Sequence, residues 1–580
     1  MMGVVPRAQD GLVSIRDGGV SGPGRGYVGV VKVRLLAVTA GQGAAGSLHG
    51  GLPGKCRLQT ERIKMKSIPT AMAAALLILI GRAPAQTPPQ SPPAVKIGRD
   101  TTWILKPLKA DGTPDYLAAL NEQFGKGVTK DNNAFVALIE ALGPGLLPEQ
   151  IRSATLKALD VKLPTASPFL RPVERAGPLF EQFEAARKGP WGAADHPELA
   201  KWLKANAAPL AKVGAATSRS RFFVPTVKPK AEPAVIHLVI PQYGGVRSAA
   251  RALVARANLA ASEGRIDDAL TDLLAAYRLG ALVGQDYTVV GRLVAAAIIL
   301  EVLDRVADLA VSGKVTAGQA RAVTATITET GPPPSFAPAL LGERYTGLDV
   351  VIWISKKPNH ARFRQVISST LAPQNGPTAE TPVPAHSPLD RVFQRADYNV
   401  VLRRMNALYD EMAAAAASPT FAARVQEVAR FRDRAERTRQ VAAKLCSPKA
   451  DRAAATEWVA NMLVSALTPL LGRAPILMDL VSVRRDLALV AFALAAHRAE
   501  KGKYPNRLAA LVPAHLKRLP SDFCSGKPFI YLSDGRGFVL YSVGENMRDD
   551  GGRGEGEGDD CDDIVLRTSA NSVEGNKPSR

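Results

Sequence analysis

Apolar residues recur every three or four positions along most of the chain, which is the pattern of amphipathic helices. The clearest example is Arg247–Val283, where two such runs flank Gly264. Asp267 and Asp268 follow the glycine, and negative charge is favourable in the first turn of a helix. The pattern predicts two antiparallel helices joined by a short turn.

The segment SEGRIDDALTDLLAAYRL within this hairpin resembles one tetratricopeptide-type unit. No regular 34-residue recurrence accompanies it, so an ordinary helix pair is the preferred interpretation. Val289–Val311 is apolar on most faces and predicts a buried helix, because its charged residues would be costly inside a membrane. Thr316-Ala-Gly-Gln319 has the form of a capping box and predicts the start of the next helix.

Other helices are predicted on both sides of this region. Tyr116–Phe124 and Asn133–Leu142 have helical spacing of apolar residues. Asp390–Lys444 predicts two long helices broken at Ser418-Pro419, and Glu457–Leu480 predicts packed helices rather than a membrane span. Residues 371–388 are rich in Pro, Thr and Ala, which is typical of a disordered loop.

The pattern changes near the C-terminus. Val481–Glu500 predicts a strong helix, and alternating residues in Pro528–Leu532 and Gly537–Ser542 predict two strands. Asp534-Gly535 supplies the turn of a hairpin, and Ile564–Leu566 can return as a last strand. The expected fold is therefore mainly α, a multi-helix body built from helical hairpins, with a small C-terminal α+β domain that contains a short antiparallel sheet.

A segment in the N-terminal part of the chain predicts export. Met65–Gln86 reads MKSIPTAMAAALLILIGRAPAQ, with a basic start, an apolar run and a small-x-small cleavage site, the layout of a secretory signal peptide. Its apolar run is about ten residues, whereas a helix needs about 20 to span a bilayer. We interpret Met65 as the true start and 1–64 as translated upstream sequence; the alternative is an unusually long leader. The mature chain is expected in the periplasm, the cell envelope or outside the cell.

These patterns divide the chain into nine regions. They are an upstream extension (1–64), the signal peptide (65–85), a Pro-rich linker (86–98), an N-terminal helical region (99–235), the hairpin region (236–345), an irregular connection (346–389), long helices (390–480), the α+β domain (481–567) and a disordered tail (568–580).

The formal net charge is +21, from 74 Lys and Arg against 53 Asp and Glu. Residues 1–85 contain eleven of these bases and three of these acids, so their removal lowers the net charge to +13. No block of Lys and Arg with interleaved aromatic residues occurs, and nucleic-acid binding is therefore not expected. Contact with anionic polymers or lipid head groups of the cell envelope fits the mild basic bias.

No catalytic motif stands out in the sequence. HExxH, GxSxG, GxxxxGK[ST] and paired-cysteine metal patterns are all absent, and the seven histidines are scattered. The mature chain has Cys446, Cys524 and Cys561. A Cys524–Cys561 disulfide is conceivable in an oxidising compartment, and three free thiols are the alternative.

One loop departs sharply from the basic character of the chain. Residues 545–563 hold nine acids and two arginines, interrupted by glycines. Calcium takes six to eight oxygen ligands and tolerates irregular loops, and glycine lets backbone carbonyls turn inward. The loop therefore predicts a calcium site; the alternative is a solvated acidic loop that keeps the region soluble.

The C-terminal region resembles the globular domain of the major, GspG-like pseudopilins of type II secretion systems. The resemblance covers Val481–Arg567 through HRAEKGKYP, LAALVP, SGKPFIY, GFVLYSVG and DDCDDI, in that order. In that family the acidic loop wraps a calcium ion. The resemblance implies calcium ligands among six aspartates: Asp549, Asp550, Asp559, Asp560, Asp562 and Asp563.

The rest of the chain departs from pseudopilins, which begin with a prepilin cleavage site and a transmembrane helix. Here a signal peptide and a long helical region precede the match. The whole mature chain is similar to a group of bacterial exported proteins, through DTTWILKPLKADGTPDYLAALNEQFGKGV and NVVLRRMNALYDEM. That resemblance implies export but no activity.

Three functions are compatible with these patterns. The first is a non-enzymatic exported protein, a helical scaffold for a protein partner, with a calcium-stabilised C-terminal domain and no transmembrane segment in the mature chain. The second is an accessory component of a type II secretion or pilus-like system. The third is a cell-envelope hydrolase whose catalytic groups meet only in three dimensions.

Overall fold

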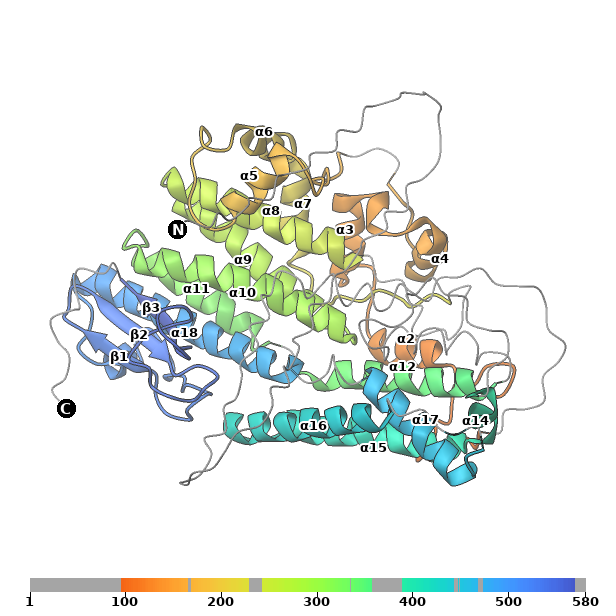
Figure 1. The fold of residues 1–580 in the computed structure, drawn as a ribbon. Helices are drawn as coiled ribbons and strands as arrows, with labels where there is room; N and C mark the ends of the chain where they lie inside the picture. Colours follow the sequence, from red (N-terminus) through yellow and green to blue (C-terminus); the bar gives the residue numbers. More distant parts are fainter. Residues whose placement is uncertain are drawn as a thin grey trace, which may run out of the picture. The chain divides into compact units, whose positions relative to one another are not determined.

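The computed structural model describes residues 95–164, 168–228, 242–333, 335–356, 389–442, 447, 449–467 and 473–568. These residues are mainly helical and end in a three-stranded antiparallel sheet, as predicted (Figure 1). The predicted upstream extension, signal peptide and loop at 371–388 lie outside the described residues, as do Cys446 and all but the first residue of the predicted tail.

Six short helices and one 3₁₀ turn form the N-terminal region, with Pro or Gly at most of the breaks. The two predicted helices here are confirmed, and each begins at a side-chain cap: Asp115 accepts from the Ala118 N–H, and Asn133 accepts from the Phe135 N–H. The elements are α2 (Tyr116–Phe124), α3 (Ala134–Leu142), η1 (Pro144–Leu146), α4 (Glu149–Leu159), α5 (Pro178–Ala186), α6 (Pro197–Ala205) and α7 (Ala207–Ala216).

The predicted hairpin is formed by α8 (Gln242–Ser262) and α9 (Ile266–Val283). Gly264 joins them with φ +78°, a conformation that favours glycine. Both helices pack closely against α10 (Val289–Val311), which is buried along most of its length as predicted. Alanines are frequent among the buried residues of α8, for example Ala249, Ala252 and Ala255. These helices carry the largest apolar core of the described residues, which we call the body core.

α11 (Ala317–Thr330) begins with the predicted capping box. The Thr316 hydroxyl accepts from the Gln319 N–H, and the Gln319 side chain accepts from the Thr316 N–H at 2.9 Å. The next helix, α12 (Ala337–Ser355), is longer than expected. We placed an irregular connection at 346–389, but 346–355 continue the helix, because GLDVVIWIS is apolar on nearly all sides and is buried there.

Replacement of Thr316 by alanine is expected to lower the free energy of unfolding by about 1 kcal/mol, because the N-cap acceptor of α11 is lost. Chemical denaturation monitored by circular dichroism measures this change. Thr328→Ala is the matched control, since Thr328 lies exposed inside the same helix. Alanine has the higher helix propensity there, so Thr328→Ala should leave stability unchanged or slightly raised. Equal losses in both variants would contradict the capping role.

The described helices between residues 389 and 467 pack with α2 and α12 around a second apolar core. The predicted break at Ser418-Pro419 is confirmed between α15 (Tyr398–Ala416) and α16 (Phe421–Ala442). A further short helix that we did not predict, α14 (Leu389–Arg395), precedes them, and α17 (Arg452–Leu467) follows. Asp397 explains the interruption between α14 and α15, because its side chain caps the N-terminus of α15 at the Asn399 and Val400 N–H groups.

The last helix, α18 (Ala474–Lys501), packs against α10 and α11 on one side and against the sheet on the other (Figure 1). The sheet has the order β1-β2-β3, with β1 (Ile530–Ser533) and β3 (Ile564–Arg567) both antiparallel to the central β2 (Phe538–Ser542). A 3₁₀ turn, η2 (Leu508–Leu511), lies between α18 and the strands. The apolar contacts between α18 and the sheet form a third core, which we call the C-terminal core.

Among the described residues, no helix combines the length and the apolarity that a membrane crossing needs.

Candidate metal centre

The acidic loop connects β2 to β3 and is anchored at its start by a residue from outside the loop. Asp522 is 1% exposed, and its two carboxylate oxygens accept hydrogen bonds from four donors. Two of these donors are the Ser542 hydroxyl, at 2.7 Å, and the Val543 N–H, at the point where β2 ends. The anchor fixes the position from which the loop departs.

The six predicted aspartates separate into two groups. Asp550 and Asp563 are buried and Asp562 is half-buried, so these three lie on the inner side of the loop. Asp549, Asp559 and Asp560 are exposed. Asp549 is nevertheless engaged, because its Oδ1 accepts from the Tyr541 hydroxyl at 3.0 Å and from the Gly551 N–H at 2.9 Å. The structure therefore does not bring the six side chains together.

Asn546 links the inner aspartates. Its Nδ2 donates to Asp550 Oδ2 at 2.8 Å and to the Asp560 carbonyl at 2.9 Å, and its backbone N–H donates to Asp562 Oδ2 at 3.0 Å. The Asp562 N–H also donates to Asp550 Oδ2, at 3.2 Å. Asp563 Oδ2 accepts from the Gly552 N–H at 2.8 Å. Each inner carboxylate thus has one oxygen that is bound to the loop itself.

Two oxygens on the inner side have no such bond. Asp562 Oδ1 and Asp563 Oδ1 are buried and have no hydrogen-bond partner among the described residues. Burial raises the pKa of Asp562 to about 6, and the charges of Asp550 and Glu545 add to the effect. Burial likewise raises the pKa of Asp563, next to Asp550 and Asp549. A buried carboxylate oxygen without a partner is costly, so these two atoms are the unusual feature of the loop.

Gly544 makes the close approach of Asp562 possible. It has φ +68°, and a Cβ there would lie 2.2 Å from the Asp562 carbonyl oxygen and 2.5 Å from Asp562 Oδ1. Any larger residue would force this part of the loop apart. The absence of a side chain at Gly544 therefore allows the two ends of the acidic loop to approach each other next to the unpartnered Asp562 Oδ1.

Calcium prefers hard oxygen ligands, and the unpartnered Asp562 Oδ1 and Asp563 Oδ1 are the atoms that would coordinate it. The residues that would hold it are Asp550, Asp562 and Asp563. As they stand, however, no three or more His, Cys, Asp or Glu side chains in the described part of the chain form a group that could hold a metal ion. The donor chemistry of the inner aspartates nevertheless fits calcium.

Sequence reasoning missed Asn546 and Asp522, which organise the loop and its base. Both act over long sequence separations, with hydrogen bonds from Asn546 to Asp560 and from Ser542 and Val543 to Asp522. The disulfide that we left open is not formed: Cys524 and Cys561 are both buried free thiols. Burial raises the pKa of Cys524 to about 12, with Asp522 adding to the effect, so this thiol is not activated as a nucleophile.

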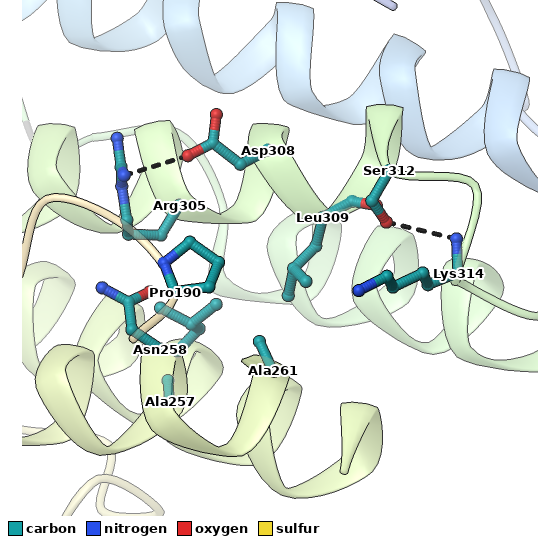
Figure 2. Close-up of a pocket in the computed structure, with 10 residues that line it drawn as sticks. Pro190, Ala257, Asn258, Ala261, Arg305, Asp308, Leu309, Ser312 and Lys314 are labelled. Carbon is teal, nitrogen blue, oxygen red and sulfur yellow. Dashed lines mark hydrogen bonds and ion pairs between the residues drawn. The ribbon is translucent and has the colours of Figure 1, made fainter. Parts of the chain in front are cut away.

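Two hollows lie outside the acidic loop in the described part of the chain. The first, of about 70 Å³, lies between α8, α10 and the segment around Pro190, with an Arg305–Asp308 ion pair at 3.0 Å on its wall (Figure 2). It has room for only a few water molecules, whereas ligand pockets usually exceed about 300 Å³. The second, of about 590 Å³, is an open surface depression between α3 and α7 with a polar rim.

Comparison of the chain with known protein families, curated proteins and solved structures finds no match. The resemblance to pseudopilins therefore stays a hypothesis based on the quoted segments.

Proposed function

We propose that this protein is a non-enzymatic, exported scaffold whose C-terminal domain is pseudopilin-like and stabilised by a structural calcium ion. The observation that carries the proposal is the pair of buried, unpartnered oxygens of Asp562 and Asp563 beside Asp550. The helical body would bind a protein partner. The metal would act on stability and not on a reaction.

The physical argument concerns charge. Three inner carboxylates in one loop repel one another, and burial adds a desolvation penalty to each ionised group. A divalent cation offsets both costs at once, since it supplies opposite charge and takes up the free oxygens. Because β3 follows Asp563 directly, a closed loop would also secure the last strand of the sheet.

The test is thermal unfolding of the purified protein with added calcium and with chelator. A ligand that binds only the folded state stabilises it by about 2.7 kcal/mol at a hundredfold excess over its dissociation constant. We expect a calcium-dependent rise in melting temperature that Asp562→Asn together with Asp563→Asn abolishes. Asp559→Asn together with Asp560→Asn is the matched control, because it removes the same two charges from exposed positions of the same loop.

Magnesium provides a second control, because it demands stricter octahedral geometry and keeps its water molecules more firmly than calcium does. We expect a weaker effect from magnesium than from calcium at equal concentration. An unchanged melting temperature at millimolar calcium would show that the loop is a solvated acidic loop, and the structural metal would be rejected.

A role beside a type II secretion or pilus-like machine is the second candidate. What supports it is the sequence of elements in the C-terminal domain: a long helix, a hairpin, an acidic loop and a last strand, which is the order that the pseudopilin resemblance implies. Crosslinking in cells, followed by identification of the attached proteins, tests this candidate. Recovery of secretion components would support it, and their absence from the crosslinked products of a correctly exported protein would contradict it.

A further inference from the structure

A group of arginines lies away from the acidic loop, where α5, α8 and α10 meet. Arg247 and Arg251 are one turn apart on α8 and therefore share a face of that helix. Arg187 follows α5 directly. Two carboxylates accompany them, Glu184 on α5 and Glu301 on α10. We call these five residues the arginine cluster.

The carboxylates in the cluster are taken up mainly by one arginine. Arg187 donates from Nη1 to Glu184 at 2.6 Å and from Nε to Glu301 at 2.7 Å. Arg251 stays farther away, with Nη1 at 3.6 Å from Glu184 and Nε at 3.6 Å from Glu301. These distances exceed those of a hydrogen bond, and Arg251 Nε is buried without a hydrogen-bond partner among the described residues.

The positive charge of Arg247 has even fewer contacts with the two carboxylates than that of Arg251. Its side chain is half-buried, and in the described part of the chain it makes no hydrogen bond and no ion pair. Burial lowers the pKa of Arg247, with Arg187 and Arg175 among the neighbouring charges that act in the same direction. Burial and the same kind of like-charge contact lower the pKa of Arg251 to about 10. Three guanidinium groups thus face two carboxylates, which leaves one positive charge without a partner.

We infer that Arg247 and Arg251 bind a third carboxylate, presented by a ligand. One negative charge balances the cluster, and the planar fork of arginine matches the two oxygens of a carboxylate. Arg187 already binds two carboxylates, with one hydrogen bond to each. The site remains reachable, since the Arg251 side chain is 23% exposed and Glu184 is 36% exposed at its edge.

The inference rests on the proposed function, in which the helical body binds a protein partner. That partner would supply the carboxylate. The ligand would be an acidic segment of a protein partner; a small carboxylic acid is the other source of the same group. The calcium loop is a separate feature of another part of the chain, and the two proposals can fail independently.

The experiment measures binding of a fluorescent tetraglutamate peptide to the purified protein at low ionic strength, with tetralysine as the charge-reversed control. We expect Arg247→Gln to weaken tetraglutamate binding by about tenfold, because a charge-assisted hydrogen bond contributes roughly 1.5–3 kcal/mol. Arg432→Gln is the matched control, since Arg432 is exposed on α16 and removes the same charge. Arg247→Lys keeps the charge but loses the fork and should give an intermediate value.

The outcomes separate the alternatives. Competition by acetate at the same carboxylate concentration identifies a small-acid site, whereas binding of the peptide alone identifies an acidic segment as the ligand. Equal peptide affinity in the native protein and in a folded Arg247→Gln variant would overturn the inference, as would no binding of either probe at low salt. Calcium-dependent stabilisation should be unchanged in Arg247→Gln, which keeps this test independent of the acidic loop.

Discussion

Replacement of Phe492 by alanine is expected to lower the free energy of unfolding by about 3–5 kcal/mol. Phe492 lies on α18 with 0% of its surface exposed, among the residues of the body core. Its removal deletes a large buried side chain and leaves a cavity at the contact of α18 with α10 and α11. Urea denaturation followed by circular dichroism measures the loss.

The variant also tests whether α18 couples two parts of the chain. Leu494 and Val490 on the same helix belong to the C-terminal core, so α18 contributes to both cores. All five tryptophans precede α18, and tryptophan fluorescence therefore reports on the helical body alone. Phe538, fully buried in β2, is the matched partner position in the C-terminal core.

If the two cores unfold together, Phe538→Ala shifts the fluorescence transition of the body by about the same amount as it shifts the overall transition. Two separate transitions, with fluorescence insensitive to Phe538→Ala, would show instead that the C-terminal domain unfolds independently. In that case α18 would be a linker between independent units and not a shared structural element.

The sequence predicted helices best where the apolar pattern has clear ends. α10 begins and ends at the predicted residues, because Thr288 caps its start and polar residues follow Val311. The end of α12 was not predictable in this way, since its last two turns are apolar all round and show no helical period. β1 begins at Ile530 and not at Pro528, and Pro528 forms only an isolated bridge to Ser521.

The acidic loop shows the same limit at the level of a site. Its composition predicted a cation, but six aspartates at similar spacing give no indication of which side of the loop each occupies. Burial separates them: Asp550, Asp562 and Asp563 lie inside, and the other three are exposed. Asn546 binds two of the inner three, Asp550 and Asp562, and asparagine is a residue type that is common in loops and carries no particular expectation of a site.

Replacement of Arg424 by methionine is expected to cost about 3 kcal/mol at pH 8, because it leaves a buried carboxylate without its partner. Arg424 on α16 forms an ion pair with Asp479 on α18, and the two side chains are 14% and 11% exposed. Arg424 also donates to the Ser418 carbonyl at 2.8 Å. The pair is imperfect, since Arg424 Nε and Asp479 Oδ2 are buried without partners among the described residues.

The cost should depend on pH in a defined direction. Burial raises the pKa of Asp479 to about 6 even with Arg424 beside it. A carboxyl group with a raised pKa holds its proton more tightly in the folded state. It therefore stabilises the fold below its unfolded pKa, about 3.9, and this contribution is lost as the pH rises through about 6. Without the guanidinium the pKa rises further, so Arg424→Met should cost little at pH 4 and most at pH 8.

A double-mutant cycle separates the pair from its burial. Arg424→Met combined with Asp479→Leu removes both charges and should recover most of the stability lost in Arg424→Met, since replacement of a buried ion pair by apolar residues is often neutral or stabilising. The exposed pair Arg434–Glu411, at 2.7 Å between α16 and α15, is the control. Arg434→Met should cost less than about 1 kcal/mol, with no change between pH 5 and pH 8. An equal loss of stability in Arg424→Met at pH 4 and at pH 8 would contradict the predicted role of Asp479. It would mean that the ionisation of Asp479 does not govern the contact between α16 and α18.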